Sequence, residues 1–443
     1  MERISEAVEN VRELIVNTEK FIFEHPETGY KEKVTSKYLE DVFEGLGYTL
    51  TRAVDITGFY TVIDTGRKGP EILVLAELDS IICPEHPASD PVTGAAHSCG
   101  HNAQCAALVG IAAALRDEQI LKNMCGKIRL CAVPAEELLE IEYRKELVKK
   151  GIIKYLGGKS EFLHRGYFDG VDIAFMVHTS TNYSVNAGSV GCIAKNIIYK
   201  GVAAHAGGAP WNGVNALYAA SCGINAVNAL RETFQEQDII RFHPIITNGG
   251  SMVNAIPETV ALESYVRGKS FKAISEENKK INRALCGAAL SIGANVEIID
   301  IPGYSPLVND KGMIDLCADA AAIAIPQYEF KVQDRYSSGS TDMGDLSTIM
   351  PVVHPYAAGA CGKAHGNDYK IKNVQSACID NAKWQLTMLR LLLENNAERA
   401  YSILREYTPI FNSKEEFLSF LDSQNSFGNR IIYNEDNTAT VIL

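Results

Sequence analysis

The chain has 443 residues, of which 46% are hydrophobic and 22% charged, and its formal net charge is −12. Chains of this length usually fold around more than one hydrophobic core, so we expect two domains. The acidic balance argues against nucleic acid and anionic membranes as partners, and no stretch reaches the ~18 uninterrupted apolar residues of a membrane span.

Helical and strand-like segments alternate through the first part of the chain. Apolar residues recur every three to four positions in the opening helix, and further helices are expected at 31–46 and 103–116. Short apolar runs predict strands at 60–63, 72–75 and 127–133. This alternation predicts an α/β fold with a mainly parallel sheet and helices on both faces.

The pattern changes near residue 190. Strand-like runs and two long helices follow in the order β-α-β-β-α-β, which fits a small ferredoxin-like α+β domain inserted into the first. The segments behind this order are the strands 190–199, 258–267 and 295–301 and the helices 213–232 and 276–288. We expect a main domain of residues 1–189 and 305–443, closed by a helix at 376–395, and an inserted domain of residues 190–304.

The eleven cysteines are odd in number and scattered through apolar runs. This pattern is typical of buried thiols in a reducing compartment rather than of a disulfide framework. The N-terminus is polar and carries no apolar signal region. We therefore expect a cytoplasmic protein.

The segment His97-Ser98-Cys99-Gly100-His101-Asn102 is the most informative one. A thiol and an imidazole two residues apart can converge on one ligand only in a non-helical turn, which Gly100 favours. A buried cysteine beside a capping histidine is an equally good explanation of this motif alone. A nucleophilic Cys99 with His101 as its base is a weaker one, since such neighbours rarely share a productive hydrogen bond.

Glu136 and Glu137 follow the apolar run 128–133 and a proline, which places them at the C-terminal end of a strand. Ligands of open α/β sheets bind at that edge. One carboxylate can bind a metal while its neighbour acts as general base, and a metal-dependent hydrolase needs both roles. The alternative is a solvated pair in a loop.

Three more polar residues interrupt the pattern at expected strand ends or in loops. His178 ends the apolar run 171–177, Asp79 ends the run 72–78, and His365 lies in a glycine-rich loop. A lone histidine at a strand end is more often structural than functional. Together with Cys99 and the glutamate pair, however, these residues predict a two-metal site.

Further motifs extend over nearly the whole chain. They are His25-Pro26-Glu27, Cys99-Gly100-His101, Ala135-Glu136-Glu137, Val177-His178, Gly201-Val202-Ala203-Ala204-His205-Ala206, Asn254-Ala255-Ile256-Pro257 and Ala364-His365. With them the chain resembles the aminoacylase/carboxypeptidase family of dinuclear metallopeptidases. The resemblance is strongest to its amidohydrolase branch, which includes hippurate, auxin-conjugate and aminobenzoyl-glutamate hydrolases.

The resemblance implies a role for each residue of the predicted metal site. Cys99 would bridge two divalent ions, zinc or manganese, and Glu136 would be the catalytic base. Glu137 and His365 would complete one ion, and His101 and His178 the other. Asp79 would support the site from behind the ligands.

The same resemblance implies that the inserted domain dimerises and acts as a lid. A histidine at the position of His205 would reach the active site of the partner subunit and stabilise the oxyanion. Asn254 and Arg267 would contact the substrate, with Arg267 binding its carboxylate. Without the family, an exposed turn residue is the plainer explanation of His205.

The chain departs from the branch at several places. The usual Arg-Ala-Asp-Met-Asp is here Leu75-Ala76-Glu77-Leu78-Asp79, and Asn102 stands where Asp is frequent. A charged segment, 138–150, replaces the usual glycine-rich run, and we expect most of it to form a solvated helix face. Residues 336–345 are more similar to the aminobenzoyl-glutamate hydrolase and dipeptidase subgroup.

These observations predict a cytoplasmic, homodimeric, two-metal amidohydrolase. Its substrate would be a small N-acyl amino acid, an aminobenzoyl-glutamate-like compound or a dipeptide. The alternative is a non-catalytic partner subunit or binding protein that retains the fold. The segment after about residue 400 has no predicted role.

Overall fold

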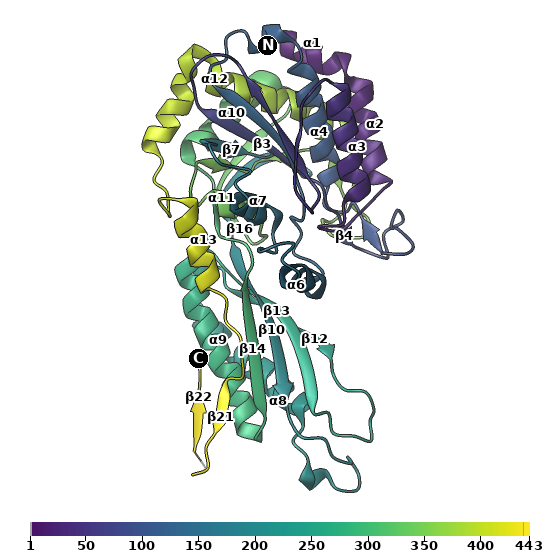
Figure 1. Cartoon of the computed structure of the whole chain (residues 1–443), viewed down its shortest axis with the longest axis vertical. Helices are drawn as coiled ribbons and strands as arrows, with labels where there is room; N and C mark the ends of the chain where they lie inside the picture. The colour runs from purple at the N-terminus through teal and green to yellow at the C-terminus, as the bar shows by residue number, and fades with distance from the viewer. Residues whose placement is uncertain (1, 437) are drawn as a thin grey trace. The chain divides into compact units, whose positions relative to one another are not determined.

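The structure, a computed structural model, describes residues 2–436 and 438–443 and divides the chain into two compact units (Figure 1). Unit 1 consists of Met1–Gly188, Leu307–Arg335 and Thr341–Lys414. Unit 2 consists of Ser189–Pro306, Tyr336–Ser340 and Glu415–Leu443. Among the described residues, no helix has both the length and the apolar character needed to cross a membrane.

A six-stranded sheet in the order β1-β2-β6-β3-β7-β17 forms the centre of unit 1. Its strands are β1 (Thr51–Arg52), β2 (Phe59–Asp64), β6 (Lys127–Val133), β3 (Glu71–Glu77), β7 (Ile173–Phe175) and β17 (Val352–Val353). The pairs β6–β3, β3–β7 and β7–β17 are parallel, and the pairs β1–β2 and β2–β6 are antiparallel. Every residue of β3 is buried, as expected for a strand covered on both faces.

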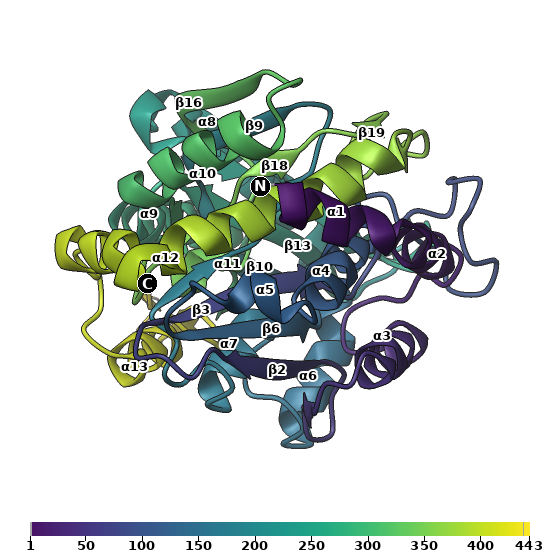
Figure 2. The same cartoon turned by 90° about the horizontal axis from the view of Figure 1, so that it is seen from above.

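Helix α4 (His101–Ala114) packs on β3, and all of its residues are buried. Its small apolar residues let α2 and α12 approach it closely, and Figure 2 shows α4 and α12 crossing the sheet. The other helices of unit 1 are α1 (Glu2–Asn10), α2 (Arg12–Phe23), α3 (Lys33–Gly45), α5 (Glu118–Leu121), α6 (Ile141–Lys149), α7 (Gly158–His164), α10 (Lys311–Ala324), α11 (Met343–Leu346) and α12 (Asn381–Glu406). These features confirm the predicted α/β class with a mainly parallel sheet.

A second sheet has the order β15-β9-β18-β8, with β16 paired to β9. Its strands are β15 (Leu307–Val308), β9 (Tyr183–Ser189), β18 (Tyr356–Ala357), β8 (His178–Thr179) and β16 (Phe330–Ser337). The parallel pair β18–β8 sets Tyr356 opposite His178. Two short ribbons complete this part of the chain: β4 (Ile81–Ile82) with β5 (Ala95–Ala96), and β19 (Ala360–Cys361) with β20 (Lys370–Ile371).

Unit 2 contains an antiparallel sheet in the order β11-β13-β10-β14, with β12 also paired to β13. Its elements are β10 (Gly191–Lys200), α8 (Ala216–Leu230), β11 (Arg241–Phe242), β12 (Ile245–Asn248), β13 (Thr259–Gly268), α9 (Phe271–Ile292) and β14 (Asn295–Pro302). Helices α8 and α9 pack against each other and against the strands. The strand order is that of the predicted ferredoxin-like arrangement.

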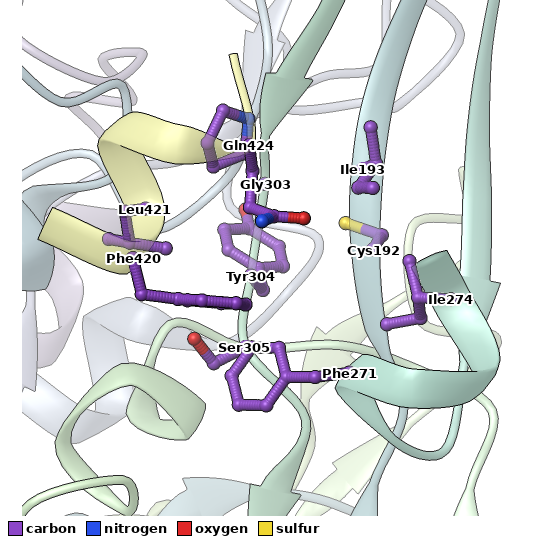
Figure 3. Close-up of a pocket in the computed structure, with 11 residues that line it drawn as sticks. Cys192, Ile193, Phe271, Ile274, Gly303, Tyr304, Ser305, Phe420, Leu421 and Gln424 are labelled. Atoms are coloured by element: carbon purple, nitrogen blue, oxygen red, sulfur yellow. The ribbon is translucent and has the colours of Figure 1, made fainter. Parts of the chain in front are cut away.

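The C-terminal segment, Glu415–Leu443, belongs to unit 2. From the sequence, all of residues 305–443 were expected in the main domain. The reason for this difference is an apolar contact made by helix α13 (Lys414–Ser423). Figure 3 shows Phe420 and Leu421 of this helix lining a pocket with Phe271, Cys192 and other residues of the sheet and of α9. The rings of Phe420 and Phe271 meet edge to face with their centroids 4.9 Å apart. A final ribbon, β21 (Ile431–Tyr433) with β22 (Ala439–Val441), follows.

Candidate metal centre

The turn that carries Cys99 and His101 depends on a glycine between them. Gly100 has a φ of 96°, in the left-handed region that side chains other than glycine rarely adopt. A Cβ atom at this position would also lie 2.4 Å from the hydroxyl of Tyr369 and 3.0 Å from Cβ of Thr179. The turn ends where α4 begins, at His101, so both side chains project from one tight, buried corner.

Asp79 links the end of β3 to two of the predicted ligands. Nδ1 of His101 donates a hydrogen bond to the backbone oxygen of Asp79 at 2.8 Å, and it lies 3.3 Å from the carboxylate. The other carboxylate oxygen of Asp79 accepts a hydrogen bond from the backbone N–H of Glu137 at 2.8 Å. Because Nδ1 of His101 carries the donated proton, its Nε2 is left to bind another group.

The segment with Glu136 and Glu137 follows β6 and is held by two buried charged side chains. Ala135, with a φ of 55°, donates its backbone N–H to the Glu32 carboxylate at 2.8 Å. The guanidinium of Arg144 donates to the backbone oxygens of Glu137 and Leu156, the latter at 2.7 Å. Arg144 lies on α6, and its side chain is buried. The expectation that this charged segment forms a solvated helix face was therefore wrong for Arg144.

The predicted ligands converge on two overlapping groups that share Cys99. The ligand atoms of Cys99, His101 and His178 all lie within 4.8 Å of one another, and so do those of Cys99, Glu137 and His365. Sγ of Cys99 is 3.3 Å from Nε2 of His178, and Nε2 of His365 is 3.0 Å from Oε1 of Glu137. The structure thus brings together five residues that are far apart in the sequence.

Backbone contacts orient the two remaining histidines. The ring Nδ1 of His178 lies 2.8 Å from the backbone oxygen of Thr179, which leaves Nε2 for Cys99. His365 has a φ of 63°, and its backbone N–H donates to the oxygen of Ser98 at 2.8 Å. This bond ties the late loop to the Cys99 turn.

The charges of the cluster shift one another strongly. Burial and the Glu137 carboxylate raise the pKa of the Cys99 thiol, but the imidazoles of His178 and His101 outweigh them and lower it to about 6. Burial also raises the pKa of Glu137, and a hydrogen bond from His365 outweighs that effect and lowers it to about 2. Burial and the carboxylates of Glu77 and Glu137 raise the pKa of Glu136 well above its usual range. Strongly shifted groups in one buried cluster are typical of a functional site.

This donor set fits two transition-metal ions. Two ligand atoms that bind the same zinc ion, each at about 2.0–2.3 Å from it, lie roughly 3–3.7 Å apart. The distances between the ligand atoms of Cys99 and His178 and between those of Glu137 and His365 fall in this range. Nε2 of His101 is buried and makes no hydrogen bond of ordinary geometry to any described residue. A mixed set of thiolate, imidazole and carboxylate suits zinc and its neighbours in the first transition series.

A buried ion network that was not predicted from the sequence lies behind the cluster. Nζ of Lys159 lies 2.5 Å from Oε1 of Glu77 and also bonds to Asp342, and all three side chains are 0% exposed. Glu77 was visible as an acid at the end of an apolar strand, which is itself a signal. Lys159 had no such signal, because it follows Gly157 and Gly158 in a short helix whose burial depends on tertiary contacts.

Three of the predicted site residues, His205, Asn254 and Arg267, belong to unit 2. His205 lies in a turn, where its Nδ1 accepts hydrogen bonds from the backbone N–H groups of Gly207 and Gly208 at 3.2 and 2.9 Å. Asn254 is exposed beside it, and its backbone oxygen accepts a bond from Ala206. Arg267, on β13, donates to the hydroxyl of Ser340 at 2.7 Å. Their approach to a substrate stays a prediction.

The chain is similar in sequence to two dipeptidases at moderate identity. The chain is 31% identical to the Xaa-Arg dipeptidase of Mus musculus over 299 residues, which are 66% of this chain and 62% of that protein. The match to the human Xaa-Arg dipeptidase covers 58% of that protein. The chain therefore spans less than two thirds of the length of these dipeptidases.

Solved structures share the fold at lower identity. A putative aminohydrolase from methicillin-resistant Staphylococcus aureus aligns with a TM-score of 0.72 at 20% identity, over 89% of this chain and 100% of that one. A Bacillus subtilis protein described as a dinuclear metal binding peptidase of the M20 family aligns with a TM-score of 0.65 at 20% identity, over 87% and 99% of the two chains. The sequence matches the profile of one family, Peptidase family M20/M25/M40, over residues 74–389. Because that match spans more than half of the chain, the protein belongs to peptidase family M20/M25/M40.

Proposed function

We propose that this protein is a two-metal amidohydrolase that cleaves the amide bond of an N-acyl amino acid, an aminobenzoyl-glutamate-like compound or a dipeptide. The observation that carries the proposal is the sharing of Cys99 between two groups of ligand atoms, next to Glu136. Membership of a peptidase family supports it. So do the names of relatives, among them a dipeptidase and a p-aminobenzoyl-glutamate hydrolase subunit.

We assign the five clustered residues as metal ligands, with zinc or manganese as the ions. Cys99 would be shared, His101 and His178 would hold one ion, and Glu137 and His365 the other. Asp79 would orient the site, because it binds both His101 and the backbone of Glu137. When bound, the two ions would supply an acidified water molecule and polarise the substrate carbonyl.

Glu136 would be the general base and then the general acid. Its carboxylate would take a proton from the attacking water, whose oxygen forms the new bond to the carbonyl carbon. It would then deliver that proton to the leaving nitrogen as the C–N bond breaks. Without metal, burial and neighbouring carboxylates raise the pKa of Glu136, so its carboxyl holds a proton firmly. Two bound cations would favour the carboxylate form, which accepts the proton.

We further propose that unit 2 supplies the substrate contacts and a homodimer interface. His205 would donate a hydrogen bond to the oxyanion in the active site of a partner subunit. Asn254 and Arg267 would bind the substrate, with Arg267 contacting the carboxylate of the substrate. Apolar side chains near His205 support an interface, since Trp211 and Val253 are 78% and 101% exposed. Free cysteines throughout the chain suit a reducing compartment, for which we propose the cytoplasm.

The experiment that tests this function is Glu136→Gln in protein loaded with zinc or manganese. We expect hydrolysis to fall by at least about a thousandfold, because the proton carrier is lost, while metal content stays near that of the wild type. Glu142→Gln is the matched control, since Glu142 is exposed on α6 and pairs only with a nearby lysine among the contacts seen. Wild-type turnover in Glu136→Gln would contradict the proposal.

A screen of small amides would narrow the substrate. Acyl-amino acids, aminobenzoyl-glutamate and dipeptides with C-terminal arginine should be compared with either metal added. Hydrolysis of only one of these three classes of amide would identify the substrate class. A protein that binds both metals and substrates yet hydrolyses none would instead favour the alternative, a non-catalytic binding protein or partner subunit.

A further inference from the structure

Glu77, the last residue of β3, places its carboxylate beside Nε2 of His101, the ring atom that we assign to metal binding. Oε2 of Glu77 lies 3.2 Å from Nε2 of His101, and both side chains are buried. Ligand atoms of Glu77, His101 and Glu136 all lie within 4.8 Å of one another. This third group overlaps the Cys99 cluster at His101, so Glu77 borders the position that we assign to one ion.

The contact is hard to explain as a simple hydrogen bond in the metal-loaded protein. Nδ1 of His101 already donates to the oxygen of Asp79, so a neutral ring presents a lone pair at Nε2. A lone pair and a carboxylate oxygen repel each other unless a proton on Nε2 or a metal ion lies between them, and metal binding to the imidazole displaces that proton. Two oxygen or nitrogen ligands of one ion, each at about 2.0–2.2 Å, are roughly 3–3.5 Å apart, which matches the observed 3.2 Å.

Buried partners fix the Glu77 carboxylate in this orientation. Lys159 binds Oε1, while Oε2 accepts one hydrogen bond from Nε2 of Gln104 at 3.0 Å. Asp342 anchors Lys159 twice, through its ammonium and through its backbone N–H, the latter at 3.0 Å. One oxygen of Glu77 is therefore neutralised by a cation, and the other is directed towards His101.

We propose that Glu77 is a further protein ligand of the ion held by His101 and His178, and that Lys159 and Asp342 are positioning residues that hold it there. The inference rests on the proposed two-metal function, because it adds a ligand to that centre. Monodentate binding through Oε2 would leave the Lys159 contact at Oε1 intact. The chain would thus hold this ion with one carboxylate more than the resemblance to its family implies.

Glu77→Gln tests the assignment without any substrate. Metal-free protein is titrated with Co²⁺, and the visible absorption bands and the number of bound ions are recorded, followed by Zn²⁺ binding in competition with a chelator. We expect one of the two ions to bind at least about tenfold more weakly, with changed cobalt bands, because one ligand is removed. Asp342 remains as a counter-charge for Lys159, so the variant is expected to fold.

Glu71→Gln is the matched control. Glu71 lies at the other end of the same strand and is also buried in an ion pair, with Arg129 at 2.6 Å. This variant should keep the cobalt spectrum and both affinities of the wild type. It separates loss of a ligand from loss of a buried carboxylate in β3.

The outcomes distinguish this inference from the proposed function. Wild-type protein that binds no Co²⁺ or Zn²⁺ would overturn both. Wild-type protein with two ions and a Glu77→Gln variant with unchanged cobalt bands would overturn only the ligand assignment, even if affinity falls. Should Glu77→Gln fail to fold, Glu77→Asp keeps the charge beside Lys159 but shortens the side chain, and the same spectral change is expected; unchanged bands again overturn the assignment.

Discussion

Each unit buries a lysine, and the two lysines have different surroundings. In unit 1, Lys159 bonds to two carboxylates, Glu77 and Asp342. In unit 2, Lys195 bonds to one carboxylate, Asp300, and to the amide oxygen of Asn282 at 2.7 Å. Both ammonium groups are 0% exposed, so their burial costs the same kind of desolvation.

The charges around each lysine decide the direction in which its pKa shifts. Burial and the nearby Arg430 lower the pKa of Lys195, and the single Asp300 does not offset them. Burial acts on Lys159 in the same way, but Asp342 and Glu77 outweigh it and raise its pKa. Near Lys195 a single carboxylate faces two cations, Lys195 and Arg430, whereas near Lys159 the carboxylates outnumber the lysine. We attribute that surplus of carboxylates to the proposed metal centre, where cations would bind.

Among substitutions that compare the two units, we expect the largest effect from replacing each lysine in turn. Lys159→Met should lower hydrolysis about 10–100-fold per folded molecule, because Glu77 is no longer held beside His101. Lys195→Met should leave hydrolysis by the folded protein within about twofold. Both variants should lose roughly 3–5 kcal/mol of unfolding free energy, since each leaves a buried charge unpaired. Initial rates and urea unfolding measure the two effects.

A second substitution separates stability from chemistry. Adding Asp342→Asn to Lys159→Met removes one of the unpaired carboxylates and should recover part of the stability but little of the rate. Adding Asp300→Asn to Lys195→Met should recover stability in the same way. If Lys195→Met loses as much activity per folded molecule as Lys159→Met, the contrast between the two lysines is wrong.

The cysteines allow a second test of the difference between the units. Cys222 of unit 2 is exposed, and Cys99 is buried in the proposed metal centre. In metal-free protein the imidazoles lower the pKa of Cys99 to about 6, so its thiolate dominates at pH 7 and falls about tenfold by pH 5. We expect iodoacetamide to modify Cys99 after chelation, about tenfold faster at pH 7 than at pH 5, as followed by peptide mass spectrometry.

Cys222 serves as the internal reference for this experiment. It should react whether or not metal is bound, because its exposure does not depend on the cluster. Bound zinc should protect Cys99 by occupying its thiolate. Equal modification of Cys99 with and without zinc would contradict its role as a ligand.

Apolar runs in the sequence predicted where part of the site lies, because Asp79, Glu136 and His178 follow such runs and neighbouring parallel strands bring these ends together. Cys99, His101 and His365 follow no such run, and their place in the site was predicted from their motifs and the family resemblance. The burial of Lys159 and Arg144 could not be predicted in this way. Each reaches its partners through a side chain that crosses the core, and a charged residue in a polar stretch carries no sign of that burial.

Element boundaries and the C-terminal segment show the same limit. The long helix of unit 2 was predicted from residue 276 but begins at Phe271, because the side chain of Ser270 accepts a hydrogen bond from the backbone of Ala273 and caps it. The strand predicted at 127–133 is found with the same bounds in the structure. Its apolar run was easy to recognise, because all of its residues but the first are buried. Within unit 2, helix α13 packs through Phe420 on Phe271, a contact between residues about 150 positions apart in the sequence.

The smallest expected effect concerns a carboxylate that is partnered by an amide. Glu19 on α2 accepts a hydrogen bond from Nδ2 of Asn102 at 2.8 Å, and burial raises its pKa from 4.5 to about 7. Between these values the folded state binds more protons than the unfolded state, so the unfolding free energy falls as the pH rises and the loss is complete above about pH 7.

Glu19→Gln should therefore stabilise the protein by about 1–3 kcal/mol at pH 8 and have little effect near pH 4.5, because glutamine keeps the acceptor without the charge. Urea unfolding at both pH values measures the gain, with Glu13→Gln on the exposed side of the same helix as control. An equal gain at both pH values would place its origin in packing or helix propensity. A gain confined to high pH would show that a buried carboxylate with only an amide beside it lowers stability, whereas the carboxylates around Lys159 are held by a cation.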